Sequence, residues 1–381
     1  MDGREYSSLA AMLSDLPDPR RARGRRHHWG TILTLIAAAL ASGQQGMQAI
    51  SQWVAEHAEE LCALLQPPRG RLPSDATLRR ALRALDLAAL EQRVAAYVEG
   101  LAAPSDGGAA AVGLAVDGKA VRGANAHGAA VHLVSLVRHD DGRVLRQVAV
   151  AEKSNEITAA PRLLADRDLT GAVVTMDALL TQRSLAEQIR QQGGHYLLVV
   201  KENHPTLYAA IDQLFTGEVP VEPSDHAASV TTREKRHGRL TTRTLERTAA
   251  LNDYLDWPDV GQVLRRTYHA VHLTTGKVSH EVTYGLTSLP AAATTPAEVE
   301  QVWRGHWTIE HRVHYPRDVP LGEDACQVRA GNAPQALAAL RNALLSLLRA
   351  QGWTNIAAAL RHYGAYAARA LRLLAALPAG L

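Results

Sequence analysis

The sequence predicts a mixed α/β protein with helical segments at both ends. Three observations lead to this prediction. Residues 1–100 have apolar residues at helical spacing, residues 114–200 alternate strand-like with helix-like segments, and residues 217–289 return to strand-like segments. Because strands that come first as a meander and then alternate with helices are typical of one mixed sheet, we expect an α/β core between two helical regions.

The composition is that of a globular protein with a sizeable core. The chain has 381 residues, of which 46% are hydrophobic, and this length predicts two or three structural units. No apolar run reaches the roughly 20 residues that span a bilayer. The polar start MDGREYSSLA does not resemble a signal peptide. Cys62 and Cys326 have no metal-type spacing, so a cytoplasmic protein outside the membrane is expected.

Residues 1–100 predict an N-terminal helical domain. Apolar residues recur at helical spacing in residues 31–43, 49–65 and 72–86, and glycine or proline stands at the breaks. A leucine stripe marks the inner face of the third of these helices. Its remaining faces carry three arginines, Arg79, Arg80 and Arg83.

The small-residue stretch LAAPSDGGAAAVG, residues 101–113, is expected to be a linker that leads into a central domain over residues 114–330. The first part of that domain alternates between the two kinds of segment. In order, these are LAVDGKAV, VHLVSLVRHD, VLRQVAVAE, ITAAPRLLADRDL, GAVVTMDALL, QRSLAEQIRQQG, HYLLVVKEN and PTLYAAIDQLF. Residues 217–289 are interpreted as a β-rich insertion.

Helices are expected to close the chain. The stretch TPAEVEQVWRGHWTIEHRV predicts one helix, with Thr295 as its cap and Pro296 at its first position. Proline removes a helical hydrogen bond and clashes one turn back, so Pro316 should kink or end that helix near Tyr315. Two apolar helices are then expected over residues 331–381.

Two strand-like segments carry an aspartate where burial would be costly. Asp117 lies in LAVDGKAV, and Asp177 lies at the end of AVVTMD. A carboxylate inside a buried strand is unfavourable unless it is paired or binds a metal. Either residue alone could simply cap the following turn. Together with Glu310 on a later helix, they favour a site in which three carboxylates hold two Mg²⁺ ions, for which Mn²⁺ can substitute.

The helix that carries Glu310 has two possible interpretations. Residues three, four and seven apart share a helical face. One side therefore presents Trp303, His306, Glu310 and His314, and an adjacent strip presents Arg304 and His311. This arrangement suits a metal ligand among groups that hold a polyanion. The alternative is an amphipathic helix with its apolar residues in the core, which we favour for Trp307 and Ile309 but not for Glu310 and His306.

With these residues in view, the chain resembles bacterial insertion-sequence transposases of the DDE type, in the H-repeat-associated (ISAs-type) branch. The resemblance covers nearly the whole chain. It rests on ordered blocks that include LPDPRRARGRRHHW, VDGKAVRGA, VAEKSNEI, DLTGAVVTMDALLTQR, YLLVVKENHPTLY, RGHWTIE, HYPRDV and GEDACQVRAGNAP. The resemblance implies an RNase H-like catalytic core in which Asp117, Asp177 and Glu310 are the catalytic carboxylates, interrupted by a β-rich insertion.

The chain departs from the family pattern at several positions. The tyrosine–arginine–glutamate–lysine signature would fall on Trp303, His306, Glu310 and Arg317, so that only the glutamate is retained. Further departures stand where the family usually has a histidine, an acidic residue and a small apolar residue; these are Leu180, Thr241 and Pro316. None of them removes a carboxylate of the expected metal site.

Basic residues indicate an anionic partner, which the resemblance identifies as DNA. The net charge is +3, and the densest cationic run is RRARGRRHHW, residues 20–29, which suits phosphate contacts. A solvated basic loop is the alternative. The residues expected to contact DNA are Arg20, Arg21, Arg23, Arg25, Arg26, Arg79, Arg80, Arg83, Lys119, Lys201, Arg239, Arg304, His306 and Arg317.

The leading functional hypothesis is a transposase that cuts DNA at the inverted-repeat ends of its element. The freed 3′-hydroxyl would then attack target DNA, and work on paired ends suggests a homodimer. Both steps are displacements at phosphorus, so one metal site can serve both. The alternative is a catalytically decayed or domesticated DNA-binding protein that regulates or binds the ends. A nuclease without strand transfer is a third hypothesis.

Overall fold

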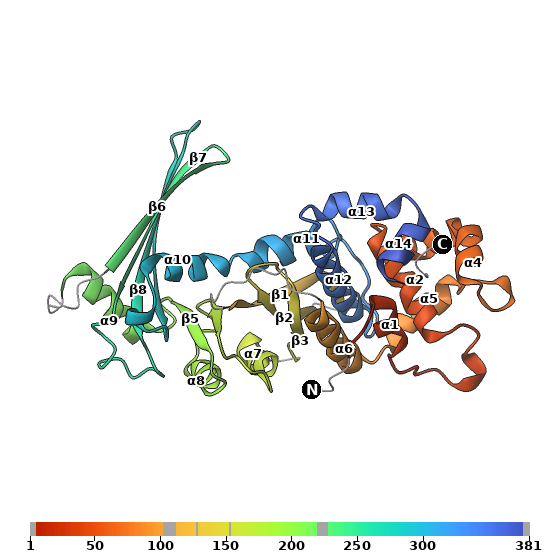
Figure 1. Cartoon of the computed structure of the whole chain (residues 1–381), viewed down its shortest axis with the longest axis horizontal. Coiled ribbons are helices and arrows are strands. Elements are labelled where there is room, and N and C mark those ends of the chain that lie inside the picture. Colours follow the sequence, from red (N-terminus) through yellow and green to blue (C-terminus); the bar gives the residue numbers. More distant parts are fainter. Residues whose placement is uncertain (1–4, 102–111, 127–128, 152–153, 219–227, 376–381) are drawn as a thin grey trace. The chain divides into compact units, whose positions relative to one another are not determined.

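The computed structural model describes the chain except for residues 1–4, 102–111, 127–128, 152–153, 219–227 and 376–381 (Figure 1). The chain divides into two compact units. The helical unit comprises Met1–Gly108, Gly118–Lys153 and Thr308–Leu381, and the sheet unit comprises Ala109–Asp117 and Ser154–Trp307. Most of the linker expected over residues 101–113 lies outside the described residues, and the four-part division of the chain stays a prediction.

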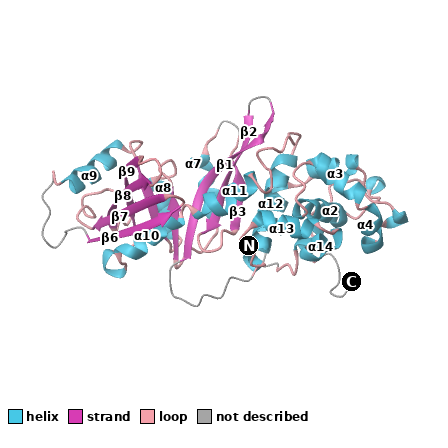
Figure 2. Cartoon of the chain, turned by 90° about the horizontal axis from the view of Figure 1, so that it is seen from above, coloured by secondary structure: helices cyan, strands magenta, loops and turns pink. Residues whose placement is uncertain are grey.

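The helical unit combines helices from both ends of the sequence, drawn in cyan in Figure 2. They are α1 (Leu9–Ser14), α2 (Trp29–Ala41), α3 (Met47–Glu56), α4 (Ala58–Leu65), α5 (Asp75–Ala84), α6 (Leu87–Gly100), α12 (Ala333–Ala350), α13 (Ile356–Gly364) and α14 (Ala367–Leu373). Helix α2 is apolar all round and is buried at every position except Thr31. It contacts α12, α13 and α14, so the two predicted helical regions share one core.

Three strand segments complete the helical unit. The second part of β1 (Val112–Ala126) precedes β2 (Ala129–Arg138), which pairs antiparallel with β3 (Val144–Ala149). A small core joins these strands to α12, because Val121, Ala124 and Leu133 pack with Ala338 of that helix. The helical unit therefore has its own strand layer.

The sheet unit holds strands in the order β1-β4-β5-β9-β8-β7-β6. The first part of β1, β4 (Ala172–Met176) and β5 (His195–Val200) run parallel. The others are antiparallel: β6 (Ala228–Arg236), β7 (Arg239–Thr248), β8 (Gln262–His272) and β9 (Val278–Thr287). The helices of this unit are α7 (Glu156–Leu164), α8 (Arg183–Gln191), α9 (Pro205–Thr216) and α10 (Pro296–Gly305). The predicted mixed α/β fold is confirmed.

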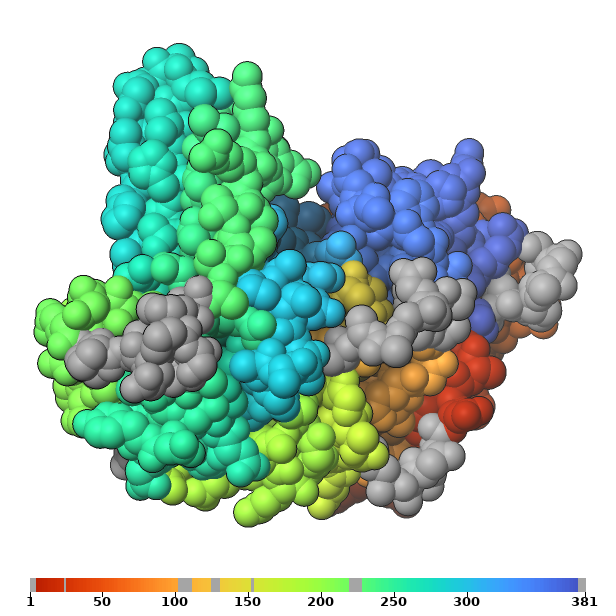
Figure 3. Space-filling view, turned by 60° about the vertical axis from the view of Figure 1, so that its left-hand side comes forward, coloured from red at the N-terminus to blue at the C-terminus, as the bar shows by residue number. Residues whose placement is uncertain are grey.

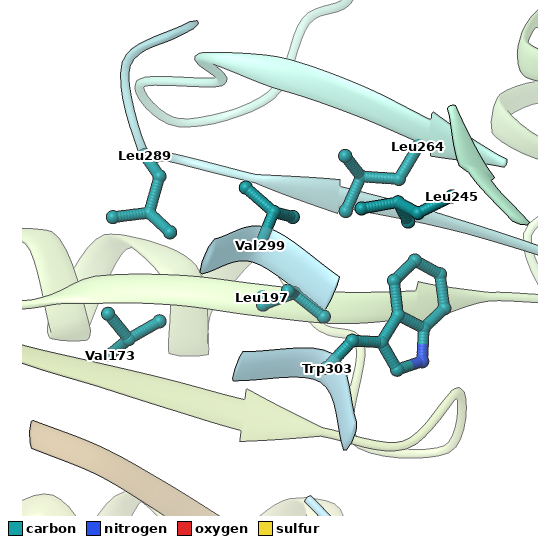
Figure 4. Packing of buried hydrophobic residues seen from close by; sticks show 7 residues of the cluster. All are labelled: Val173, Leu197, Leu245, Leu264, Leu289, Val299 and Trp303. Carbon is teal, nitrogen blue, oxygen red and sulfur yellow. The ribbon is translucent and has the colours of Figure 1, made fainter. Parts of the chain in front are cut away.

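Helix α10 packs on one face of this sheet. Figure 4 shows Val299 and Trp303 of α10 directed toward strand residues that include Leu197 and Leu264. A Cβ atom on Gly285 of β9 would approach the Trp303 ring to 2.7 Å. Glycine at this position therefore lets the indole lie directly on the strand, and the packing fixes the side of the sheet to which α10 belongs.

The β-rich segment expected over residues 217–289 contains the antiparallel strands β6 to β9. Their distal ends extend past α10 in Figure 1 and form the green and cyan projection in Figure 3. The hairpin β6–β7 turns at His237 and Gly238, which both have positive φ. Among the described residues, no helix is both long and apolar enough to cross a membrane.

The single helix predicted over residues 295–313 is wrong in its second half. Thr295 caps α10 as expected, and Glu298 completes the capping box. Helix α10 then ends at Gly305, a turn follows at residues 306–307, and Glu310–His314 form a π-helical segment. The chain continues into the short helix α11 (Tyr315–Asp318), so Pro316 does not end the helical path.

Candidate functional site

The register of the parallel strands brings the two aspartates together. Val116 of β1 is the partner of Met176 of β4, and each is followed directly by an aspartate, Asp117 and Asp177. Neighbouring strands lie roughly 4.8 Å apart, so these two residues stand side by side at one edge of the sheet. Both are half-buried. This is the acidic pair that the sequence predicted, within one unit.

The two aspartates lie on the face of the sheet that α10 covers. Side chains alternate along a strand, so Asp177 continues the face of Thr175 and Val173. Val173 belongs to the core that Trp303 of α10 completes. The carboxylates are therefore on the same side as the C-terminal end of α10.

Hydrogen bonds fix the turn that follows Asp177. The backbone N–H of Leu180 donates to Asp177 Oδ1 at 3.1 Å, and the Thr181 hydroxyl donates to the Val199 carbonyl at 2.6 Å. Leu180, where the family usually has a histidine, is fully buried. One carboxylate oxygen thus accepts a hydrogen bond from the turn, and the buried Leu180 side chain offers no ligand.

His306 connects the end of α10 to the aspartate face. Its Nδ1 lies 3.0 Å from Thr175 Oγ1, and that hydroxyl also donates to the Leu114 carbonyl at 3.2 Å. The His306 Nδ1–H is then the donor to Thr175, which leaves Nε2 as an acceptor. Burial lowers the pKa of His306, while the nearby Asp177 carboxylate partly opposes this shift. The imidazole is therefore neutral at neutral pH.

Glu310 begins the π-helical segment of the helical unit. The turn between β2 and β3 holds this segment, because Thr308 donates to the His139 carbonyl at 3.1 Å and Arg312 donates to the Asp140 carbonyl. Single π-helical turns are frequent at functional sites. The Glu310 side chain is 55% exposed. It is therefore presented on an irregular but anchored turn.

His314 holds Glu310 from one helical turn away. Its Nδ1 lies 3.1 Å from Glu310 Oε2, and the imidazole is almost completely buried. Burial, together with the charge of Arg317, lowers the pKa of His314 to about 4. A neutral Nδ1–H therefore donates to the carboxylate and orients it.

Two residues expected to contact DNA lie instead in buried ion pairs. Arg317 is fully buried and pairs with Glu323 at 2.6 Å, and Arg341 lies 3.6 Å from the same glutamate. Lys119 is 8% exposed and lies 2.5 Å from Asp318, whose pKa is raised by burial. In this conformation Arg317 and Lys119 stabilise the segment that follows Glu310.

The other predicted basic residues are at least partly exposed. Arg20 pairs with Asp18 at 2.9 Å and lies over the Trp29 ring at 5.1 Å. Arg79 pairs with Asp75, and Arg304 lies 3.5 Å from Glu234 with 45% of its side chain exposed. The remaining exposed members are Arg21, Arg23, Arg25, Arg26, Arg80, Arg83, Lys201 and Arg239. They are spread over both units.

Of the two apolar residues near Glu310 that were expected in the core, one is buried and one is exposed. Ile309 is 1% exposed, as expected, but Trp307 is 55% exposed, so its expected core position is wrong. Trp303, which was expected to share a helical face with His306 and Glu310, packs in the core of the sheet unit instead. A buried ion pair was not expected from the sequence: Arg266 of β8 meets Glu300 of α10 at 3.0 Å. An acidic residue beside Val299 on the inner face of α10 was the available signal.

Paired aspartates at the ends of parallel strands define an acidic centre of the kind that metal-dependent enzymes carry. A family model described as Transposase DDE domain matches residues 108–348, and one described as DDE_Tnp_1-associated matches residues 10–98. The chain therefore belongs to the bacterial DDE transposases, in the H-repeat-associated branch. The family implies the use of divalent metal ions, and the carboxylate oxygens of the aspartate pair fit such ions.

Individual relatives agree with this family. The chain is 31% identical over 350 residues to "Putative transposase YncI" of Escherichia coli O157:H7, which covers 90% of this chain and 87% of the relative. It is 28% identical over 351 residues to "H repeat-associated putative transposase YhhI" of Escherichia coli strain K12. This match covers 90% of this chain and 91% of the relative. A solved piggyBac transposase synaptic complex with hairpin DNA is similar at a TM-score of 0.44, with 10% identity over 91% of this chain and 72% of that one, which is too low to bear on the site.

Proposed function

We propose that this transposase cuts DNA phosphodiester bonds at the ends of its insertion sequence and joins the freed 3′-hydroxyl to target DNA. Asp117, Asp177 and Glu310 would hold two Mg²⁺ ions within an RNase H-like core. When bound, such ions neutralise charge on the phosphate and activate the attacking oxygen. Family membership and the donor chemistry of the three carboxylates support the proposal.

One observation carries the proposal. Asp117 and Asp177 follow partner residues in adjacent parallel strands, so their carboxylates share one edge and one face of the sheet. Two like charges at this spacing repel each other, and a divalent cation offsets that repulsion. Glu310 follows His306 by four residues in the chain and would complete the donor set.

Two histidines support the carboxylates in distinct ways. His314 donates Nδ1–H to Glu310 and holds the carboxylate in one orientation. His306 is held by Thr175, and its Nε2 would accept a hydrogen bond from the attacking water or hydroxyl. Both imidazoles are kept neutral by burial, so neither adds positive charge that would repel a metal ion.

The exposed arginines would supply the DNA interface. Arg21, Arg23, Arg25 and Arg26 lie in one exposed segment, and neutralised phosphates are the main source of affinity for DNA. Because two ends must be cut and joined in one event, we propose that a homodimer forms on paired ends. Lys119 and Arg317 support the fold in this scheme and do not touch DNA.

The test is strand cleavage on DNA that carries the two ends of the element, with Mg²⁺ or Mn²⁺ present. Asp117→Asn, Asp177→Asn and Glu310→Gln each keep the shape of the side chain and remove its charge. We expect each variant to lose about 1,000-fold or more in cleavage rate. Binding to the ends, measured by gel shift, should stay within about threefold of the wild-type affinity, because these side chains are not phosphate donors.

Asp253→Asn and Glu218→Gln are matched controls, since both residues are exposed carboxylates of the sheet unit. They should cleave at the wild-type rate. Full cleavage by any of the three site variants would overturn the metal-ligand assignment. Cleavage that proceeds equally in excess chelator would overturn metal dependence.

A further inference from the structure

A pocket of the helical unit lies outside the acidic centre. Its volume is about 650 Å³, and it is bounded by the start of α3, the exposed side of α5 and residues 325–330. Ligand sites for small molecules and single residues of polymers have volumes of roughly 300–1,000 Å³. The pocket is therefore the right size for one nucleotide and far too small for a duplex.

The side chains that line the pocket divide by chemistry. Gln48 and Gln52, one turn apart on α3, provide an amide wall, and Gln45 stands just before that helix. The Gln52 amide nitrogen also donates to Glu56 at 2.7 Å, which leaves its carbonyl oxygen as an acceptor. Arg79 and Arg83, one turn apart on α5, provide a guanidinium wall, and Gln327 and Arg329 come from the connecting segment. Among the described residues that line it, none carries a carboxylate. The pocket thus offers positive charge on one side and paired donors and acceptors on another.

Contacts outside the pocket fix its walls. Ser51 of α3 donates to Asp75 at 2.6 Å, and Arg79 donates to the same carboxylate at 2.8 Å, so α3 and α5 are joined. The buried Arg341 donates to the Gln45 carbonyl at 2.8 Å. A Cβ atom on Gly123 would lie 2.1 Å from the Cys326 carbonyl oxygen, so only glycine lets β1 support the connecting segment. The walls are therefore built before any ligand arrives.

We propose that this pocket binds one unpaired nucleotide of a DNA strand. The arginines would take its phosphate, because guanidinium groups bind phosphate oxygens with charge-assisted hydrogen bonds. The glutamines would contact the base, because an amide matches the donor and acceptor edge of a nucleobase. In a duplex the Watson–Crick edge is already used by the opposite base, and the pocket of about 650 Å³ is too small for the duplex that presents the other edge, so the amide wall favours an extruded or single-stranded nucleotide.

The proposal rests on the proposed function only in taking DNA as the polymer. It predicts that single-stranded DNA binds more tightly than duplex DNA, which cleavage itself does not require. The test measures fluorescence anisotropy of the full chain with a labelled single strand and with the blunt duplex of the same sequence, in chelator and at low salt. The chelator removes divalent ions, so the acidic centre cannot cleave the DNA during the measurement. Each of the four homopolymer single strands is also measured, to report any base preference.

The variant pair Arg83→Gln and Arg329→Gln, made together, should weaken single-strand binding roughly tenfold or more, because hydrogen bonds to charged groups are lost. The pair Gln48→Ala and Gln52→Ala should weaken it less and should flatten differences among the homopolymers. Arg71→Gln with Arg361→Gln is the charge-matched control on exposed residues outside the pocket and should change affinity less than about twofold. Thermal unfolding checks that each variant is folded.

Three results would overturn the proposal. Equal losses in the pocket pair and the control pair would mean that only total charge matters. Equal losses for single strand and duplex would mean that α5 contacts a duplex backbone. Full competition by inorganic phosphate at the concentration of the oligonucleotide would mean an anion site without a base. Asp177→Asn separates this proposal from the previous one, because it should abolish cleavage and leave the single-strand preference unchanged.

Discussion

The aspartate pair and Glu310 differ in what holds them. Asp117 and Asp177 are positioned by backbone register, since each directly follows a strand partner in the sheet. Glu310 is positioned by side chains, through His314 and the anchored π-helical turn. A backbone-determined site survives most side-chain changes around it. A site held by side chains depends on every polar contact beneath it, which makes the surroundings of Glu310 the more fragile of the two.

The interactions that stabilise the surroundings of Glu310 and of the aspartate pair also differ. In the segment that follows Glu310, the fully buried pair of Arg317 and Glu323 is joined by Arg341. Burial would raise the pKa of Glu323, but the two arginines outweigh it and keep the pKa below its ordinary value. Beside the aspartates, the corresponding support is the apolar core around Trp303. One region is stabilised by ion pairs and the other by apolar burial, and substitutions can test this contrast.

The largest effect is expected from Arg317→Met. It leaves Glu323 buried with one partner at 3.6 Å, and breaking a buried ion pair costs about 4 kcal/mol. Denaturant unfolding measures the loss, and Arg361→Met on the exposed side of α13 should cost less than about 0.5 kcal/mol. Adding Glu323→Leu to Arg317→Met should recover part of the loss. No recovery would mean that packing, not the unpaired charge, sets the cost.

Trp303→Ala should be next, at about 3 kcal/mol, because it empties an apolar position against Gly285. Trp307→Ala is the matched control, since that indole is 55% exposed, and it should stay within about 0.5 kcal/mol of the wild type. Both are measured by the same unfolding experiment. Equal losses in the two variants would contradict the division between core and surface indoles.

A pH dependence should separate the two histidines of the π-helical segment. The pKa of His314 is about 4 in the folded chain, below the ordinary 6.5, because of burial. As the pH falls from 6.5 to 4, the unfolded chain gains a proton that the folded chain does not, so the free energy of unfolding falls in that window. The expected loss is on the order of 2 kcal/mol.

His314→Gln should remove this slope, and His311→Gln should not, because His311 is exposed. Unfolding curves at several pH values provide the measurement. A slope that persists in His314→Gln would assign the pH dependence to another group.

The smallest effect is expected at Thr175. Thr175→Val keeps the side-chain shape and removes the hydroxyl that holds His306 at 3.0 Å. We expect about 1 kcal/mol of lost stability and a roughly tenfold lower cleavage rate, since His306 loses its orientation. Thr231→Val, on the exposed part of β6, should change neither. Wild-type cleavage by Thr175→Val would exclude a role for His306 orientation.

The features that local pattern determines were predictable from the sequence. Alternation and β-branched residues predicted the strands that carry Asp117 and Asp177, and the Thr295 cap and Pro296 predicted where α10 begins. These signals are short-range, because hydrophobic period and capping chemistry act within a few residues. The mixed α/β fold followed from them.

The features that tertiary contacts determine were not. The break after Gly305 and the π-helical turn at Glu310 depend on the β2–β3 turn, whose carbonyls bind Thr308 and Arg312. No local pattern in WRGHWTIEHRV predicts these hydrogen bonds to the β2–β3 turn. Lys119 pairs with Asp318, which is far along the chain, and Arg317 pairs with Glu323 across the turn that follows α11. Neither pairing is visible from the charge of the basic residue, which alone indicated a surface role. Glu310 was singled out by its position on the helical face and by the resemblance to a known family, and its role as a metal ligand stays a prediction.

The central claim is that Asp117, Asp177 and Glu310 jointly hold divalent cations. Anomalous diffraction from crystals grown with Mn²⁺ tests it most directly. The expected result is two manganese peaks, each with carboxylate oxygens from this trio at about 2.2 Å. Peaks that bind other side chains, or a Glu310 carboxylate that contacts neither ion, would contradict the account.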